Sequence, residues 1–356
     1  MRTVIAGFVV TRIALALAVT QALAAFTPGS CAICRDLSQV PLLDGLSRWD
    51  GAAYFDIARD GYGAGQNGLA AYFPLYPLLM RLGGTLLGGG GDAYLAAGLV
   101  VSNAALGVAA IALYRLASSR LGPRLAARAA VSLLVFPTAV FLSSVYADAL
   151  FLALAVTSAL AAQRSRWWTS GLLAAAAALA RPFGIVAGIP LAIAAWRARP
   201  RTSRALVALL PAPLALAAWL TYLYALTGDP VALVHGYTLG FAPRAPGQAV
   251  ADLFDPAVYG FPWLVAGSFA LFLALVVVSY RVVAIEHALY ATAMLLIIAA
   301  AGSLTSSPRY ELSIYPAFVA LAWVTRARAV GAIWLAVSSL LALLLTAVFA
   351  LGYWLG

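Results

Sequence analysis

The sequence predicts an all-α polytopic membrane protein, and three observations support that fold class. Hydrophobic residues fill 64% of the 356 positions, charged residues fill only 10%, and the mean hydropathy is +0.96. Apolar runs of roughly 20 residues, each long enough to cross a ~30 Å hydrocarbon core, follow one another along the chain. The charged residues gather between those runs. This composition excludes a water-soluble domain, and we expect a single integral-membrane domain over residues 1–356.

The apolar runs define the expected helices in chain order. The first, residues 4–26, is too long for a cleaved signal peptide and contains Arg12, so we interpret it as a retained first helix. Later runs lie at 93–116, 125–142, 145–162, 168–180, 183–196, 205–226, 258–280, 285–304, 311–325 and 330–354. Glycine and proline interrupt the pair at 168–196. Counting that pair as two crossings predicts a bundle of about eleven transmembrane helices.

The arginines support this count independently. All of the positive side-chain charge comes from 22 arginines, which lie in short clusters between the apolar runs. Membrane topology explains such clusters, so nucleic-acid binding is not needed to explain the net charge of +10. With the N-terminus cytoplasmic, the clusters fall on the cytoplasmic side, as the positive-inside rule requires. A single crossing at 168–196 would place the arginines of 197–204 outside, so two crossings are favoured. Each is short, so the two either tilt or meet as half-helices near Arg181.

Two loops are long enough to carry a site, residues 27–92 and 227–257, and both are predicted on the extracytoplasmic face of a multi-pass cell-membrane protein. The cytoplasmic loops are short and basic. Cys31 and Cys34 lie in the first loop, where a disulfide and two separate thiols are both compatible with the compartment. The two histidines are far apart and no Cys/His cluster exists, which argues against a metal site.

The first loop contains the stretch RWDGAAYFDIARDGY, whose spacing is compatible with a helix beginning near Asp50. Helical periodicity places Tyr54 and Ile57 on the face of Asp50, and Asp56 and Asp60 on a neighbouring face. Such a short, charged helix is expected to lie on the membrane surface. By spacing alone, Asp50 is equally compatible with an N-cap and with a functional carboxylate.

The stretch AYFPLYPLL and two later charged residues, Asp148 and Arg181, are further candidates for the site. Pro74 and Pro77 forbid one regular helix and predict a kinked entry to a short helix. Asp148, in VYADALF, begins an apolar run, where a central carboxylate would cost about 2.5–3.5 kcal/mol, so it faces a polar cleft or the interface. Arg181, in ALARPFGI, is either an interfacial side chain that snorkels to water or the ligand of an anion, and we favour the anion.

Three further residues complete the set of candidates. His235 lies in VHGYTLG, and Arg309 and Tyr310 lie in SSPRYEL; a structural ion pair with Glu311 is the alternative for Arg309. An outer carboxylate, several outer arginines and a wide apolar scaffold suit a substrate linked to a lipid phosphate. A carboxylate can remove a proton from an acceptor hydroxyl, while arginines hold the phosphate as it leaves. This inventory points to glycosyl transfer.

These motifs resemble a known family. WDGAAYFDIARDGY followed by AYFPLYPLL resembles the first-loop signature of the PIG-V type glycosylphosphatidylinositol mannosyltransferase II family and its bacterial relatives, within the GT-C glycosyltransferases. VYADALF, ALARPFGI and SSPRYELSIYPAF continue the resemblance in order. It implies a GT-C-like fold and an inverting transferase that uses a polyprenyl-phosphate sugar, most commonly mannose, on the extracytoplasmic side, with Asp50 as the catalytic carboxylate. The chain departs from the family pattern at Tyr72, Asp148 and Pro182-Phe183, which leaves the acceptor open.

The main hypothesis is therefore a polyprenyl-phosphate-mannose-dependent mannosyltransferase in the lipid bilayer. Asp50 is the predicted base. The predicted acceptor and pocket residues are Asp56, Asp60, Tyr54, Tyr62, Tyr76 and Asp148, and the predicted donor-phosphate ligands are Arg181, His235, Arg309 and Tyr310. No cofactor is expected, because three aspartates that do not share one helix face make a weak site for a divalent ion.

Two other classes of function stay open. Interrupted helices also mark transporters, so a transporter or flippase for a lipid-linked sugar is the first alternative. A noncatalytic subunit of a membrane complex is the second. A glycolipid, a glycan or a protein Ser/Thr would each present the hydroxyl that the base needs, so the sequence does not state the acceptor.

Overall fold

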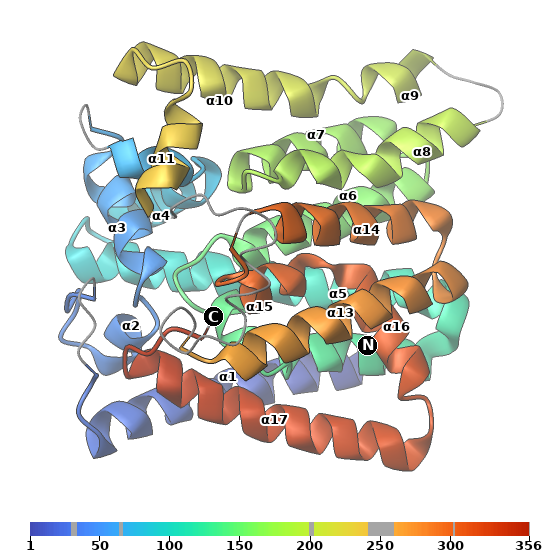
Figure 1. Ribbon diagram of the computed structural model, residues 1–356, viewed down its shortest axis with the longest axis horizontal. Helices are drawn as coiled ribbons and strands as arrows, with labels where there is room; N and C mark the ends of the chain where they lie inside the picture. The colour runs from blue at the N-terminus through green and yellow to red at the C-terminus, as the bar shows by residue number, and fades with distance from the viewer. Residues whose placement is uncertain (30–33, 64–66, 199–202, 241–259, 302, 356) are drawn as a thin grey trace.

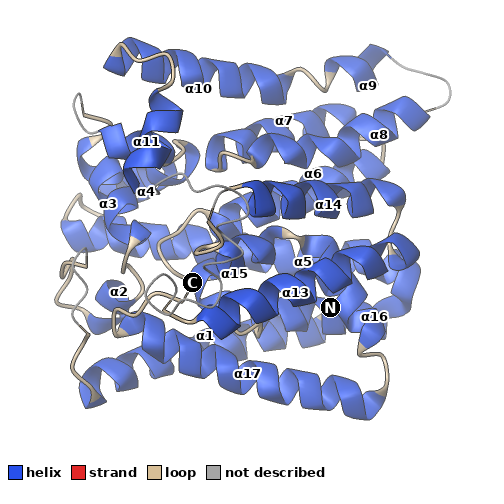
Figure 2. Ribbon diagram, in the orientation of Figure 1, coloured by secondary structure: helices blue, strands red, loops and turns tan. Residues whose placement is uncertain are grey.

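The computed structural model describes the whole chain except residues 30–33, 64–66, 199–202, 241–259, 302 and 356. Throughout that described part, the regular structure is helical and no strand occurs (Figure 2). The predicted all-α fold class is confirmed. Most of the second long loop, 227–257, and Cys31 of the first loop lie outside the described residues.

The helices follow one another in this order, with η marking 3₁₀ turns: α1 (Arg2–Ala25), α2 (Pro41–Gly45), α3 (Asp50–Asp60), η1 (Asn67–Ala71), α4 (Leu75–Leu86), α5 (Gly91–Leu134), η2 (Ala139–Leu142), α6 (Asp148–Gln163), α7 (Trp167–Ala180), η3 (Gly184–Gly188), α8 (Ile189–Arg197), α9 (Ser203–Val207), α10 (Pro211–Thr227), α11 (Ala232–Gly240), α13 (Pro262–Val282), α14 (Ile285–Ala300), α15 (Ser307–Tyr310), η5 (Glu311–Ser313), α16 (Tyr315–Val324) and α17 (Arg328–Ala350).

The long helices lie side by side with their axes along one direction, and α10 and α17 form the two outer edges in Figure 1. Five described segments are long and apolar enough to cross a membrane: α1, α5, residues 203–227, α13 and α17. The outward side of α17 exposes large apolar residues such as Leu340 (69%) and Leu344 (55%). Apolar surface of this extent requires a lipid environment. The predicted number of eleven crossings stays a prediction.

Helix α5 covers two of the expected crossings, because the chain reverses inside it. Gly122 leaves the helical conformation with φ 75° and ψ 168°, and Pro123 follows it. Glycine accepts a positive φ without a side-chain clash, and proline suits the first turn of a new helix because its missing N–H would be unpaired there. The break therefore separates two helical arms at the position where the arginine-rich connection between runs 93–116 and 125–142 was predicted.

The predicted interruption between residues 168 and 196 is confirmed. Helix α7 ends at Ala180, Arg181 is extended (φ −149°, ψ 151°), and the chain continues through η3 into α8. At Gly184, an added Cβ would lie 1.9 Å from the carbonyl oxygen of Ala177. Only glycine allows this close packing, which turns the chain at Arg181 back against α7.

Short helices gather at one end of the bundle. Helices α2, α3, α4 and α11 lie together at the left-hand end of Figure 1, and α15 lies beside them near the centre. Helix α3 confirms the helix predicted from Asp50, and its buried side includes Tyr54, Ile57 and Ala58. Helix α4 begins directly after Pro74, as the two prolines predicted. This end carries the predicted site residues of the first loop.

Candidate active site

Asp50 is the first residue of α3, and its carboxylate bonds to two side chains from other segments. Oδ2 accepts a hydrogen bond from Arg309 Nη1 at 2.5 Å, and Oδ1 accepts one from the Tyr72 hydroxyl at 3.1 Å. Among the described residues, no side chain caps the N-terminus of α3. The N-cap alternative for Asp50 is therefore wrong, because its oxygens are used in contacts beyond the helix.

The residue before Asp50 has an unusual backbone conformation. Trp49 has φ 60° and ψ −121°, a region that residues with a side chain rarely occupy. Its indole packs edge-on against Trp354, with the ring centroids 5.3 Å apart. Trp354 in turn donates from its indole nitrogen to the carbonyl of Thr305. Packing of the two indoles holds the strained backbone, which fixes the direction in which Asp50 leaves the chain.

Arg309, in α15, is the central residue of the site, and its side chain is only 1% exposed. Besides the bond to Asp50, its Nε donates to Asp148 Oδ2 at 2.9 Å. Its Nη2 is buried and has no hydrogen-bond partner among the described residues. The alternative ion pair between Arg309 and Glu311 is not formed: within the same described part of the chain, both carboxylate oxygens of Glu311 are buried without a hydrogen-bond partner.

Asp148 joins Arg309 to a second arginine. It is the first residue of α6 and is fully buried, and its Oδ1 pairs with Nη2 of Arg181 at the break between α7 and η3. The Nε of Arg181 is buried without a partner in the described structure. Asp50, Arg309, Asp148 and Arg181 thus form one chain of alternating charge, which we call the charge chain.

Aromatic rings pack against the arginines of the charge chain. The guanidinium carbons of Arg181 and Arg309 lie 5.0 and 5.4 Å from the ring centroid of Tyr310, and Arg309 lies 4.4 Å from that of Tyr146. Both arrangements suit cation–π attraction. The Tyr146 hydroxyl donates to the carbonyl of Arg48 at 3.0 Å, close to Asp50 in the chain. The rings orient the two guanidinium groups and exclude water from their faces.

A small pocket opens beside the charge chain. Its lining includes Asp50, Arg181, Tyr72, Tyr237 and Tyr310, and its free volume is about 20 Å³. That space admits about one water molecule, so the pocket is nearly closed.

A larger apolar groove of about 520 Å³ adjoins this pocket. The pocket and the groove share Pro182, Tyr237 and Tyr310, and Ile297 of α14 lies on the far side of the groove. The groove therefore leads from the charge chain to an apolar surface between η3, α11 and α14.

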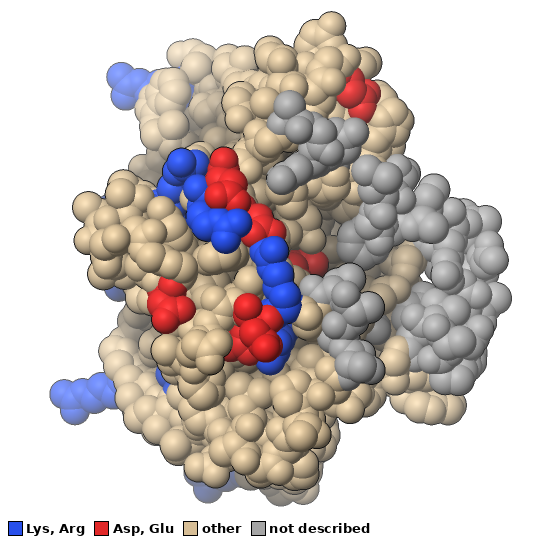
Figure 3. Space-filling view, turned by 90° about the vertical axis from the view of Figure 1, so that its left-hand side faces the viewer, with Lys and Arg blue, Asp and Glu red and all other residues tan. Residues whose placement is uncertain are grey.

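The other aspartates of α3 lie outside the pocket. Asp56 pairs with Arg35 and Arg59, and Asp60 pairs with Arg59 at 2.7 Å. Figure 3 views the left-hand end of Figure 1, where acidic and basic side chains alternate in a band across the surface. The structure thus does not bring Asp56 or Asp60 to Asp50, and three-residue groups of possible metal ligands do not occur among the described residues.

The three tyrosines predicted to shape the pocket take different positions. Tyr54 is buried in α3 and lines the pocket. Tyr62 donates to the carbonyl of Tyr72 at 2.8 Å, so it supports the pocket from behind. Tyr76 is fully buried, its hydroxyl contacts Gly98 and Ser102, and it is not among the described residues that line the pocket.

His235 lies in α11 and is not among the described residues that line the pocket. Its Nδ1 is 2.7 Å from Asp229 Oδ2, and its side chain is 58% exposed. The neighbouring Tyr237 lines both the pocket and the groove instead. Of the motif VHGYTLG, the structure therefore brings Tyr237 to the pocket and leaves His235 outside it, and the role of His235 in phosphate binding stays a prediction.

Tyr72 lines the pocket, although the sequence marked it only as part of a kinked entry and as a departure from the family pattern. Burial raises the pKa of Tyr72, and the Asp50 carboxylate raises it further, so the hydroxyl stays protonated and donates to Asp50. The spacing of AYFP after the α3 motif was the available signal, but the side-chain contact spans 22 residues of chain.

Replacing Tyr72 with Phe is expected to remove a hydrogen bond to a carboxylate and to lower the activity of the site by about tenfold. The fold should be unaffected, because the ring is retained. A matched control is Tyr280→Phe, whose hydroxyl contacts Thr292 on α14, far along the chain from the site. Equal activity of Tyr72→Phe and the unmodified protein would show that this hydrogen bond does not position Asp50.

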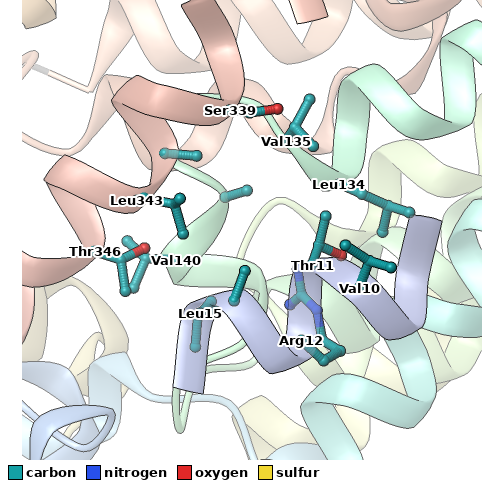
Figure 4. Close-up of a pocket in the computed structure, with 13 residues that line it drawn as sticks. Val10, Thr11, Arg12, Leu15, Leu134, Val135, Val140, Ser339, Leu343 and Thr346 are labelled. Carbon is teal, nitrogen blue, oxygen red and sulfur yellow. The ribbon is translucent and has the colours of Figure 1, made fainter. Parts of the chain in front are cut away.

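A separate cavity of about 240 Å³ lies between α1, η2 and α17 (Figure 4). Its wall is mostly apolar and includes Arg12, whose Nη1 is 3.4 Å from Asn103 Oδ1. Carboxylates are absent from the described residues that line it.

Comparison with known proteins identifies the family. The family model described as Mannosyltransferase (PIG-V) matches residues 8–198, which is more than half of the chain. GPI alpha-1,6-mannosyltransferase 2 of Mus musculus is 40% identical over 152 residues, covering 41% of this chain and 30% of the relative. The protein of the same name from Rattus norvegicus is 38% identical over 171 residues, covering 46% and 34%. The chain thus spans about a third of the length of these relatives.

Two solved structures share the fold at low sequence identity. ArnT from Cupriavidus metallidurans, bound to undecaprenyl phosphate, has a TM-score of 0.54 and 14% identity over 90% of this chain and 59% of its own. An oligosaccharyltransferase from Archaeoglobus fulgidus has a TM-score of 0.50 and 14% identity over 96% and 53%. Both are GT-C glycosyltransferases. On the evidence of the family match, the chain belongs to the mannosyltransferase (PIG-V) family and has a GT-C fold.

Proposed function

We propose that this protein transfers mannose from a polyprenyl-phosphate donor to an acceptor hydroxyl, with inversion and with Asp50 as the general base. The observation that carries the proposal is the charge chain, which sets a partly exposed carboxylate beside two buried arginines. The family membership supports mannose as the sugar.

The two arginines are suited to hold the donor phosphate. Arg309 Nη2 and Arg181 Nε are buried donors that have no hydrogen-bond partner among the described residues. A buried N–H without an acceptor costs free energy, and phosphate oxygens are strong acceptors for guanidinium groups. Arg181 also lines the pocket beside Asp50. A phosphate there would reach Arg181 in the pocket wall, and we assign Arg309, which pairs with Asp50, as its second ligand.

The apolar groove is suited to the lipid chain of the donor. It adjoins the pocket through Pro182, Tyr237 and Tyr310 and has a volume of about 520 Å³. ArnT, which has the same fold, is bound to undecaprenyl phosphate in its solved structure. A polyprenyl chain in the groove would leave its phosphate beside Arg181, at the junction of groove and pocket.

The proposed reaction is a single displacement. The acceptor O–H gives its proton to Asp50 Oδ2, and the acceptor oxygen attacks the anomeric carbon of the sugar. The bond from that carbon to the phosphate oxygen breaks, and its electron pair leaves with the phosphate. Arg309 and Arg181 stabilise the negative charge that develops there. Attack opposite the leaving group inverts the anomeric configuration.

The arginine distribution supports an extracytoplasmic site. With clusters such as 115–128 and 197–204 in the cytoplasm, the end that carries α3 and α4 faces the extracytoplasmic side of the cell membrane. A polyprenyl-linked sugar is the donor that such a site would require, because its lipid chain anchors it in the bilayer. The acceptor is a glycolipid, a glycan or a protein hydroxyl.

A transfer assay in detergent tests the function. Purified protein with polyprenyl-phosphate [³H]mannose and membrane glycolipid acceptors is expected to form labelled product without any sealed compartment. A transporter or flippase would instead move the donor across vesicles and make no product in detergent. A noncatalytic subunit would do neither alone. Either of these two results would exclude the proposed transferase.

Filling the groove should weaken donor binding. Ala300→Trp places an indole in the groove wall and is expected to raise the KM for a long-chain donor several-fold with little change in kcat, because the lipid chain is displaced while the charge chain is intact. Leu296→Trp is the control, since Leu296 lies on the same helix, is 63% exposed and is not among the described residues of the groove wall. Equal KM values for the two variants would mean that the lipid lies elsewhere.

A further inference from the structure

The proposed base is paired with an arginine in the structure. Asp50 Oδ2 lies 2.5 Å from Arg309 Nη1, and the other oxygen holds Tyr72. In this arrangement, an acceptor hydroxyl that approaches Asp50 competes with Arg309 for the carboxylate.

The geometry of the guanidinium group suggests how this pairing is released. Arg309 uses Nε for Asp148 and Nη1 for Asp50, and its Nη2 has no partner among the described residues. Guanidinium binds phosphate best through two parallel N–H bonds in one plane. Since Nε is held by Asp148, the edge left for a phosphate is the one formed by Nη1 and Nη2. A phosphate on that edge competes with Asp50 for Nη1.

We propose that Arg309 is a donor-responsive clamp: it holds Asp50 in the ligand-free protein, and the donor phosphate takes over Nη1 and frees Asp50 to act as base. This inference rests on the proposed function and adds a regulation of the same site. The base becomes active only when a donor is present, so an acceptor that arrives first meets a closed pocket.

Asp148 is the positioning residue of the clamp. It is fully buried and holds Arg309 Nε and Arg181 Nη2 with its two oxygens, so it keeps both arginines in place while Nη1 changes partner. The exchange then needs no movement of a helix. A shift of the Arg309 side chain about its bond to Asp148 suffices, and the rings of Tyr146 and Tyr310 continue to cover its faces.

Carboxylate labelling tests the clamp without measuring turnover. The purified protein is treated with a water-soluble carbodiimide and an amine, with and without saturating sugar-free polyprenyl phosphate, and labelling of each carboxylate is measured by peptide mass spectrometry. Binding of the lipid phosphate is measured in parallel by native mass spectrometry. Asp56, which is partly exposed, serves as the internal reference, and polyprenol without phosphate is the ligand control.

The lipid phosphate is expected to raise Asp50 labelling several-fold and to leave Asp56 unchanged, while polyprenol has no effect. The variant Arg309→Gln should label at Asp50 without any ligand. Arg197→Gln, which removes an exposed arginine paired with Glu286, should behave like the unmodified protein.

The two measurements distinguish a failure of the clamp from a failure of the proposed donor. If polyprenyl phosphate binds while Asp50 labelling stays constant or falls, the clamp is refuted and the transferase proposal is untouched. If polyprenyl phosphate does not bind at all, the donor assignment is refuted and the clamp with it.

Discussion

Asp50→Asn is expected to lower kcat for mannose transfer by about 10²–10⁴-fold, the usual contribution of a general base. Asparagine has nearly the same size and still accepts a hydrogen bond from Tyr72, but it cannot take a proton from the acceptor. Affinity for the lipid phosphate should not fall, since Arg309 loses its competing carboxylate and becomes more available. The measurement is initial-rate transfer in detergent together with lipid-phosphate binding by native mass spectrometry.

The control for this variant is Asp92→Asn. Asp92 lies exposed in the first turn of α5 and has the same charge as Asp50. Retention of transfer by Asp50→Asn at the rate of this control would remove Asp50 from the chemistry and would require another base in the pocket.

Asp148→Asn is expected to produce the largest loss of stability, about 3–5 kcal/mol, the cost of removing one partner from a buried ion pair. The change leaves Arg181 without this carboxylate and Arg309 with Asp50 alone. The lost contacts also release both guanidinium groups from their positions, so the KM for the donor should rise more than kcat falls. Thermal unfolding in detergent and donor kinetics measure the two effects.

A double variant that keeps the charge balanced separates two effects: the stability cost of an unpaired buried charge and the loss of arginine positioning for the donor. Asp148→Asn with Arg181→Gln removes one charge of each sign, so it should recover part of the lost stability while donor binding stays weak. If Asp148→Asn alone is as stable as the unmodified protein, Asp148 does not hold the two arginines together and the charge chain is refuted.

Local features of the site could be predicted from sequence because they depend on short-range patterns. The periodicity of the stretch after Trp49 predicted α3, and the glycine and proline after Arg181 predicted the break between α7 and α8. The free-energy cost of a carboxylate in an apolar run predicted that Asp148 faces a polar cleft or the interface, and the position of Arg181 between two short apolar segments predicted an anion ligand. Each of these arguments uses neighbours within a few residues along the chain.

The pairing of those residues could not be predicted in the same way. Asp50 and Arg309 are 259 positions apart, and Arg309 and Asp148 are 161 apart. Such contacts depend on how whole helices pack, which no local pattern encodes. The sequence therefore suggested Glu311 as a partner for Arg309 because it is near in the chain, and placed Asp148 in the acceptor pocket because it lies at a helix end.

Hydropathy also overstated the regularity of the expected crossings. Residues 135–147 are mostly buried and apolar, yet only η2 is helical there, and α16 is only ten residues long. An apolar composition reports burial and does not distinguish helix from irregular backbone inside a bundle. Non-helical backbone at membrane depth is tolerated where protein surrounds it, as it does at these residues.

The alternating charges of the site also bear on how the protein enters the membrane. Two arginines that are needed to hold a phosphate would each resist insertion into an apolar bundle if they stood alone. With Asp148 and Asp50 as partners, the group of four is neutral before any ligand arrives. The same carboxylates thus act as counter-ions during biogenesis, so the capacity to bind an anion is built into a protein that can first fold without one.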